Sequence, residues 1–225
     1  MKVRLLVKTR IVKGFGTMKS IVVLSLMIAA TVCFLSGCTK AQQLPANEKA
    51  PTEKKILIVY LSRTNNTKTV AEIIQKNVGG RSVALELETP YPADYNTTVQ
   101  QVVRENETGY LPPLKTKIER IEQYDYVFLG FPTWGMKLPP PIKSFLRQYD
   151  FKGKTIIPFN TNAGYGEGSS FQIVRALCPN STVLEGFVTK GGIERDGQLL
   201  AIKEARAEEV RNEVENWLRK IKMLQ

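Results

Sequence analysis

Histidine is absent from this chain of 225 residues, and cysteine occurs only three times. Without histidine, a Ser-His-Asp triad, a Cys-His pair and a histidine-ligated metal site are all excluded. Cys33 and Cys38 lie in an N-terminal apolar region, so Cys178 stands alone in the rest of the chain. We therefore expect no internal disulfide and no metal site, and we expect Cys178 to be a small buried residue.

Acidic residues are absent from residues 1–37, where basic residues precede a short apolar run, Ile21–Leu35. The run has about 15 residues, fewer than the roughly 20 that span a bilayer. A basic region, a short apolar run and small residues after it predict a signal peptide over residues 1–37. Its ending, Leu35-Ser36-Gly37-Cys38, resembles the lipobox of bacterial lipoproteins, which implies cleavage before Cys38 and a lipid on that cysteine. An uncleaved anchor helix is the alternative.

The formal net charge falls from +11 to +5 when residues 1–37 are removed, because they hold six basic residues and no acidic ones. The remaining chain is only mildly basic, so we expect no nucleic-acid partner. Residues 38–53 are polar, contain two prolines and show no periodicity, which predicts a flexible tether after Cys38. Residues 54–225 fit one domain of ordinary size.

Apolar runs alternate with helical patterns through residues 54–225. The apolar runs predict strands at residues 55–61, 82–87, 126–131, 155–159 and 182–188. The helical patterns lie at residues 67–77, 97–107, 141–149, 169–177 and 202–223. This alternation predicts an α/β fold whose parallel sheet is covered on both faces, with ligands at the carboxyl ends of the strands.

Three loops at those strand ends have unusual chemistry. The first, Ser62-Arg63-Thr64-Asn65-Asn66-Thr67, follows an apolar strand and opens a helix. Free N–H groups and the positive end of the helix dipole meet at such a turn, which favours a bound phosphate, although Ser, Thr and Asn are also ordinary helix caps. The second loop, Pro132-Thr133-Trp134-Gly135, carries a tryptophan, and because such a large aromatic side chain is costly to expose, we expect it to pack against another group. The third, Thr161-Asn162-Ala163-Gly164-Tyr165-Gly166, combines small residues with one aromatic.

In this order the three loops resemble those of the flavodoxin family, and the resemblance covers essentially all of residues 54–225. It implies a flavodoxin-like three-layer fold, in which a five-stranded parallel sheet of order 2-1-3-4-5 lies between helices. It also implies that residues 62–67 cradle the phosphate of FMN and that Trp134 stacks on the isoalloxazine ring. Residues 161–166 would cover the other side or the edge of the ring, although Tyr165 is equally plausible as an exposed loop residue. We find no second phosphate site, which FAD or NAD would need.

A stretch after the second predicted strand, Pro90-Tyr91-Pro92-Ala93-Asp94-Tyr95-Asn96, resembles a bacterial branch of the same family. The chain departs from the family pattern at Asn65, where glycine is usual. Asparagine is one of the few other residues that tolerate a positive φ, so we expect the loop to keep its shape.

The resemblance implies an FMN-dependent redox protein in which the flavin carries the chemistry and no side chain is catalytic. Electron carriers of the family are often strongly acidic, whereas the formal net charge of this chain without residues 1–37 is +5. An electron carrier and an NAD(P)H:quinone-type reductase therefore both stay open. The alternative from another class is a non-catalytic FMN-binding or cofactor-free module.

With a lipid on Cys38, we expect a membrane-anchored protein of the bacterial cell envelope that faces the periplasm or the cell exterior. Its partner would be an unknown redox protein or a small electron acceptor.

Overall fold

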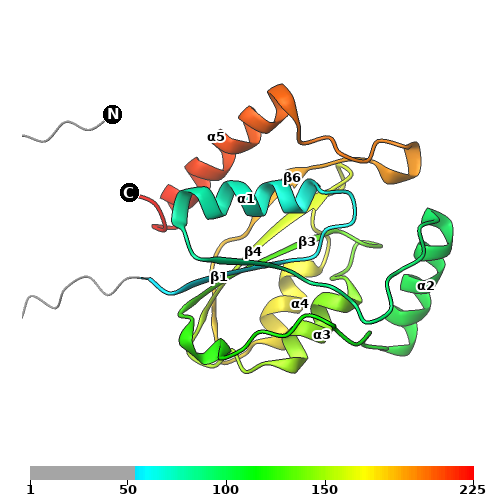
Figure 1. Ribbon diagram of the computed structural model, residues 1–225, viewed down its shortest axis with the longest axis horizontal. Helices are drawn as coiled ribbons and strands as arrows, with labels where there is room; N and C mark the ends of the chain where they lie inside the picture. The colour runs from blue at the N-terminus through cyan, green and yellow to red at the C-terminus, as the bar shows by residue number, and fades with distance from the viewer. Residues whose placement is uncertain (1–53) are drawn as a thin grey trace, which may run out of the picture. The chain divides into compact units, whose positions relative to one another are not determined.

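A parallel β-sheet runs through the centre of the domain (Figure 1). The structure is a computed structural model that describes residues 54–225, so the predicted signal peptide, Cys38 and the tether lie outside the described residues. The strand order β2-β1-β3-β4-β5 confirms the predicted order, and every pair is parallel. The strands are β1 (Ile56–Tyr60), β2 (Arg81–Ala84), β3 (Tyr126–Pro132), β4 (Thr155–Asn162), β5 (Thr182–Val183) and β6 (Phe187–Lys190), which also pairs with β4.

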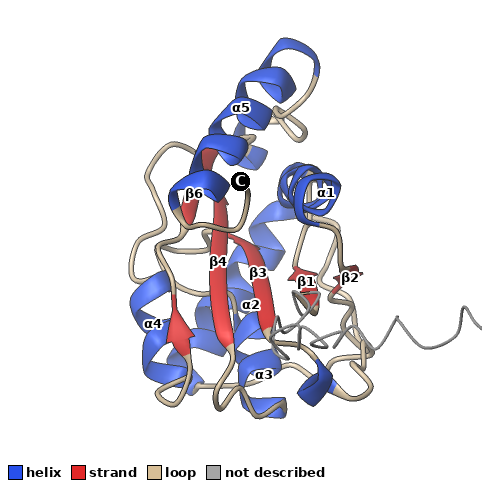
Figure 2. Cartoon of the chain, turned by 90° about the vertical axis from the view of Figure 1, so that its left-hand side faces the viewer, coloured by secondary structure: helices blue, strands red, loops and turns tan. Residues whose placement is uncertain are grey.

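Helices cover both faces of the sheet, as predicted (Figures 1 and 2). Helices α1 (Asn66–Val78) and α5 (Glu204–Lys220) lie on one face, while α3 (Pro140–Gln148) and α4 (Ser170–Leu177) lie on the other. Helix α2 (Tyr95–Thr108) stands apart, at one end of the sheet. Within residues 54–225, no helix is both long enough and apolar enough to span a membrane.

Successive residues of β1 feed two separate cores, because side chains alternate between the faces of a strand. Ile56 and Ile58 pack in the cluster that contains Trp217, whereas Leu57 and Val59 pack in the cluster that contains Phe145. Each fully buried Leu or Phe contributes about 1.5–3 kcal/mol. Both clusters are formed by residues of the described part of the chain, between Ile56 and Met223.

Three predicted strands are wrong in their extent. The run at residues 155–159 continues to Asn162 as β4, so Thr161 and Asn162 of the predicted third loop lie in the strand. The run at residues 182–188 forms two strands, β5 and β6, because the chain leaves the sheet around Gly186. A Cβ at Gly186 would lie only 2.4 Å from Cε2 of Phe171, so the backbone there is pressed against that ring. The run at residues 82–87 ends as a strand at Ala84, after which Leu87 bridges Leu114 in the antiparallel sense.

Helix α2 is two residues longer at its start than predicted, and its position results from polar contacts at both of its ends. The Asp94 carboxylate caps the helix by accepting a hydrogen bond from the Thr97 N–H at 2.7 Å. The Tyr91 hydroxyl donates to the Glu105 carboxylate at 2.5 Å, and burial together with this carboxylate raises the pKa of Tyr91. These contacts join α2 to the segment before it, and a hydrogen bond from Lys143 of α3 to Asn106 Oδ1, at 2.7 Å, joins α2 to α3.

Candidate functional site

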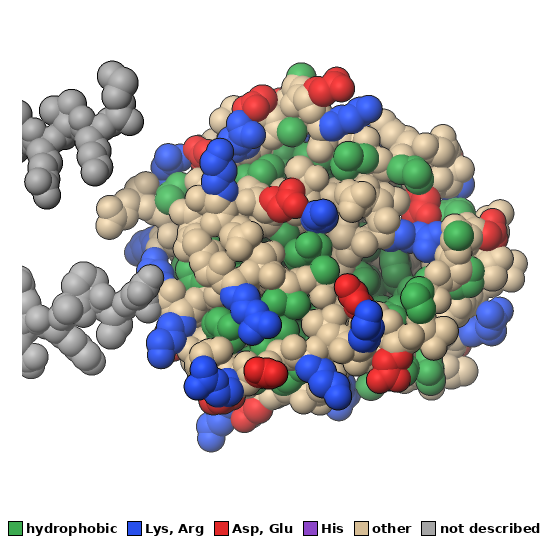
Figure 3. All heavy atoms as spheres, viewed as in Figure 1, with side chains coloured by type: hydrophobic (Ala, Val, Ile, Leu, Met, Phe, Trp, Pro, Cys, Tyr) green, Lys and Arg blue, Asp and Glu red, His purple; other side chains and the backbone are tan. Residues whose placement is uncertain are grey.

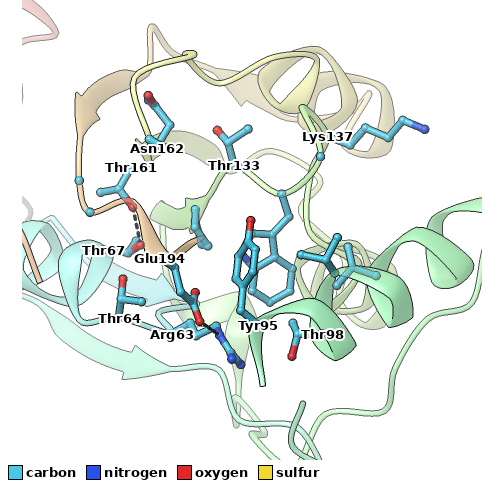
Figure 4. Close-up of a pocket in the computed structure, with 18 of the residues that line it drawn as sticks. Arg63, Thr64, Thr67, Tyr95, Thr98, Thr133, Lys137, Thr161, Asn162 and Glu194 are labelled. Carbon is cyan, nitrogen blue, oxygen red and sulfur yellow. Dashed lines mark hydrogen bonds and ion pairs between the residues drawn. The ribbon is translucent and has the colours of Figure 1, made fainter. Parts of the chain in front are cut away.

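The loops after β1, β3 and β4 meet at the carboxyl ends of these strands and border a cavity of about 270 Å³ (Figure 4). Parallel sheets bind ligands at this edge. The cavity is lined by eleven of the predicted cofactor-binding residues: Arg63, Thr64, Asn66, Thr67, Pro132, Thr133, Trp134, Gly135, Thr161, Asn162 and Ala163. A neighbouring cavity of about 240 Å³ adds Tyr165 and Gly166, while Ser62, Asn65 and Gly164 line neither of these two cavities.

The turn before α1 leaves backbone donors at the cavity. Asn65 has φ of 65°, which confirms the positive φ predicted for it, and its side chain makes no capping hydrogen bond. Ser62 Oγ accepts from the Lys68 N–H at 3.2 Å, so one N–H of the first turn is satisfied. Among the hydrogen bonds of residues 54–225, none uses the N–H of Asn66 or Thr67. Two N–H groups at the positive end of a helix dipole form an anion site.

The Asn66 side chain fixes the shape of this turn. Its Nδ2 donates to Thr64 Oγ1 at 2.9 Å and to the Leu199 carbonyl at 2.6 Å. Its Oδ1 accepts from the N–H groups of Ala201 and Ile202 at 2.9 and 3.1 Å. All four hydrogen-bonding positions of the amide are therefore used, so a ligand can be bound by the Asn66 backbone and not by its side chain.

Two buried hydroxyls join the first and third loops. Thr67 Oγ1 lies 2.8 Å from Thr161 Oγ1, and the two residues are 2% and 3% exposed (Figure 4). The pair has two O–H hydrogens and uses one between its members, which leaves one to donate elsewhere. Thr64 Oγ1 only accepts in its bond from Asn66, so its own hydrogen is also available. The first loop thus offers hydroxyl donors beside the two N–H groups.

Arg63 lines the cavity, but its guanidinium is already engaged. Its Nε donates to Glu194 Oε1 at 2.5 Å, and the two side chains are 19% and 20% exposed (Figure 4). Its Nη1 and Nη2 donate to the carbonyls of Pro92 and Ala93 at 3.0 and 2.7 Å. Arg63 therefore joins the first loop to the residues before α2 and to the loop after β6. Its positive charge also neutralises the carboxylate of Glu194 at the cavity.

A polar network ties the second loop to the third. Asn160, which is fully buried, donates from Nδ2 to the Phe131 carbonyl at 3.1 Å and to Thr133 Oγ1 at 3.0 Å. The Asn162 side chain donates to Asn160 Oδ1 and accepts the N–H groups of two glycines of the third loop, at 2.8 and 3.1 Å. The two loops are consequently held in one arrangement by the side chains of Asn160 and Asn162, which both come from β4.

Trp134 opens a tight turn at the cavity. Its N–H and carbonyl pair with those of Lys137, and the two central residues, Gly135 and Met136, have φ of 56° and 59°. Positive φ at both central positions is typical of a type I′ turn. The indole packs edge-on against the Tyr91 ring, with centroids 5.3 Å apart. The turn thus presents an aromatic side chain whose position is set on one side by a second ring.

Sequence reasoning missed one wall of the cavity, which α2 supplies together with the loop after β6. The connection after β2 looked irregular, yet a helical stripe on α2 spaced by three and four residues was a signal of an apolar face. Of its valines, Val102 is buried, while Val99 and Val103 are exposed and line the cavity. Burial and nearby Lys137 lower the pKa of Lys143, which donates to Asn106 Oδ1 at 2.7 Å and fixes this wall. The additional lining residues are Tyr95, Thr98, Val99, Val102, Val103, Asn106, Glu107, Lys137, Gly191, Gly192 and Glu194.

The cavity therefore has a polar end, with N–H and hydroxyl donors near α1, and a more apolar end along α2. Within residues 54–225, no group of three or more Cys, Asp or Glu side chains is placed to hold a metal ion. Such a cavity suits a ligand with an anionic group at one end and a flat apolar portion at the other.

Comparison with known proteins places the chain beside flavodoxins. The sequence model of the family described as Flavodoxin matches residues 55–204, more than half of the chain. A flavodoxin of Synechocystis sp. is 27% identical over 122 residues, which cover 52% of this chain and 58% of that flavodoxin. The match thus spans little more than half the length of that relative.

Solved structures show the same fold. A protein of Bacteroides eggerthii, provisionally described as a flavoprotein, is 28% identical with a TM-score of 0.60, covering 75% of this chain and 98% of that one. A flavoprotein of Lactobacillus acidophilus, solved in complex with FMN, is 23% identical with a TM-score of 0.55, covering 64% of this chain and 98% of that one. The second likeness, at its lower identity, is evidence for the fold alone.

Proposed function

Because the chain belongs to the flavodoxin family, we propose that it binds FMN at the cavity between its three loops and works as a redox protein. The observation that carries this proposal is the pair of N–H groups at the start of α1, which have no other described partner. They lie beside unused hydroxyl hydrogens, where a phosphate would be held by neutral donors and the helix dipole.

The residues present fit the cofactor. The backbone of Asn66 and Thr67, with the Thr64 hydroxyl, would hold the phosphate, and Trp134 would lie against the ring. Tyr165, which is 73% exposed and lines the neighbouring cavity, would contact the ring from that side. When bound, FMN supplies the one- and two-electron chemistry, and the protein supplies binding, orientation and the surroundings of the ring.

The ion pair between Arg63 and Glu194 has a further consequence for binding. Since the guanidinium is paired with a carboxylate, it adds little net positive charge to the phosphate site. The phosphate affinity then depends on hydrogen-bond donors, which discriminate by geometry. We propose that this selects a single terminal phosphate, as in FMN, over ligands that would need additional cations.

The direct test is the visible absorption spectrum of the purified domain after incubation with FMN. We expect FMN to bind saturably and its absorption spectrum to shift. We also expect Trp134 to quench the fluorescence of the bound flavin. Protein that stays colourless and fails to bind FMN at micromolar concentrations would leave the non-catalytic, cofactor-free module as the better description.

The choice between carrier and reductase is a separate measurement. Rapid mixing of the FMN-loaded protein with NADPH, NADH or dithionite reports which donor reduces the flavin. Fast reduction by a nicotinamide supports a reductase, whereas reduction by dithionite alone supports an electron carrier.

We also propose that the protein is anchored at the bacterial cell envelope by a lipid on Cys38. The support is the sequence around that cysteine, and the site lies outside the described residues. Mass spectrometry of the purified protein should show an acylated N-terminal cysteine, and Cys38→Ser should release the protein from the membrane fraction. An unmodified Cys38 on a chain that still starts at residue 1 would refute this anchor.

A further inference from the structure

Basic side chains gather at the opposite end of the domain from the cavity. Lys54 and Lys55 precede β1, Arg81 begins β2, and Lys76 and Lys222 lie at and just after the carboxyl ends of α1 and α5. All five are exposed, and none of them enters an ion pair among residues 54–225. We call these five residues the tether face, because the described chain begins there.

Contacts in the structure bring these cations together. Lys54 Nζ donates to the Lys222 carbonyl at 3.4 Å and lies 5.9 Å from the centre of the Tyr126 ring. Lys54, Lys55 and Arg81 line one hollow of about 580 Å³, which has no acidic residue in its lining. Figure 3 shows basic side chains gathered at this end of the domain, where the described chain begins.

Helix dipoles do not explain the whole cluster. Basic residues are favoured in the last turn of a helix, and Lys76 occupies such a position in α1. Lys54, Lys55 and Arg81 belong to the starts of strands, where no helix dipole favours them. Two acidic residues lie at the same end: Asp125 directly precedes β3, and Glu122 lies in the short 3-10 helix Ile121–Gln123, next to Gln123 of the hollow. Against the five cations they leave an excess of positive charge.

The place where the chain enters the domain indicates the partner. Fifteen residues, 39–53, separate Cys38 from Lys54, and a chain of that length reaches at most about 50 Å. An acylated Cys38 would therefore keep Lys54 and its neighbours close to a bilayer, where the headgroups of anionic lipids attract Lys and Arg. The attraction acts over about 8 Å at physiological salt, so contact requires that this face turn toward the membrane.

We propose that the tether face docks on a bilayer containing anionic phospholipid, and that docking points the cavity away from the membrane. This inference rests on the proposed anchor at Cys38. The strand β1 alone, with five residues, separates the two ends of the sheet by roughly 16 Å. In this orientation the redox partner comes from the aqueous side, and an electron acceptor buried among the lipid tails is out of reach.

The test uses the proposed mature chain, residues 38–225, with Cys38→Ser, which contains both described core clusters and carries no lipid. Sedimentation with vesicles of phosphatidylcholine containing about a third phosphatidylglycerol should show binding that weakens with salt and vanishes for phosphatidylcholine alone. Each cation near a membrane surface changes binding by about fivefold. Lys54→Gln, Lys55→Gln and Arg81→Gln together should therefore lower partitioning on the order of a hundredfold.

A matched control removes the same charge elsewhere, with Lys68→Gln, Arg104→Gln and Lys115→Gln, all exposed and outside the tether face. Binding close to the parent level in this control supports the proposal. Equal losses in the two triple variants, or no binding to anionic vesicles at low salt, would overturn it. If the first triple variant fails to fold, as judged by circular dichroism, Arg81→Gln alone should give the fivefold loss.

The outcome is separable from the proposed function. FMN binding by the unacylated chain is measured in solution, and acylation of Cys38 is measured by mass spectrometry. Neither result changes with the charges of the tether face, so a failed docking experiment leaves both of them standing.

Discussion

The hydroxyl pair formed by Thr67 and Thr161 offers the sharpest test of the phosphate site. Thr67 lies at the start of α1 and lines the cavity, so we expect Thr161 to donate to Thr67 and Thr67 to donate to the phosphate. Thr67→Val would then remove a hydrogen bond to a charged group, which is worth about 1.5–3 kcal/mol. That energy corresponds to a loss of FMN affinity of roughly 10- to 150-fold.

Thr161→Val removes only the neutral bond inside the pair, worth about 0.5–1.5 kcal/mol, so its effect on FMN should be smaller. The double variant should resemble Thr67→Val, because the two hydroxyls act in series. Each single variant should also lose about 1–3 kcal/mol of stability, since it leaves one buried hydroxyl without its partner.

Flavin fluorescence titration with FMN and with riboflavin provides the assay, because riboflavin lacks the phosphate. Thr67→Val should reduce the preference for FMN over riboflavin and leave riboflavin affinity nearly unchanged. The matched control is Thr69→Val on the same helix, whose hydroxyl donates to the Asn65 carbonyl and does not line the cavity. A larger loss in Thr161→Val than in Thr67→Val, or equal losses for both flavins, would refute the assigned direction.

Other expected results concern stability and reactivity. Gly130→Ala places a Cβ 2.1 Å from Cζ of Phe159 and should lower the free energy of unfolding in urea by about 1–3 kcal/mol. Adding Phe159→Leu to this variant should recover part of the lost stability. If the stability losses of the two substitutions simply add, the clash is not the cause. Asn65→Gly should change the free energy of unfolding little, whereas Asn65→Val should lower it by about 1–2 kcal/mol. Equal stability of the two variants would show that the turn does not need a positive φ. Burial raises the pKa of the Cys178 thiol to about 11, so native protein should resist iodoacetamide at pH 8; because the unfolded thiol ionises first, stability should fall as the pH rises from about 8.5 toward 11. Hydrogen bonds from Thr97 lower the pKa of Asp94, so its stabilisation of α2 should be complete above pH about 4 and be lost as the pH falls through the lowered pKa; unchanged amide exchange in α2 across this range would contradict the cap.

Local patterns carried most of the fold. The apolar runs at β1, β3 and β4 predicted buried strands, and the helical spacing between them predicted the covering helices. These strands and helices depend on neighbours in sequence, and the sequence displays those neighbours directly. The positive φ of Asn65 was expected from the resemblance to the flavodoxin family, in which glycine is usual at this position, because asparagine also tolerates that region.

Long-range partners could not be predicted in the same way. Arg63 meets Glu194 across 131 positions of sequence, and each could equally have been a solvated charge. The break between β5 and β6 depends on the ring of Phe171 pressing against Gly186, a contact that no local pattern encodes. The wall formed by α2 was missed for a similar reason, since its stripe of valines could have faced any part of the core.

The four hydrogen bonds of the Asn66 amide also bear on how fast a ligand is captured. They fix the turn against the segment around Leu199 and Ala201 before any ligand arrives, so binding should order few additional torsions. A site prepared in this way loses little conformational entropy when it closes on a ligand, and its association rate is governed by encounter. If the chain is exported as proposed and acquires FMN afterwards, such preorganisation would shorten the time before the site is filled.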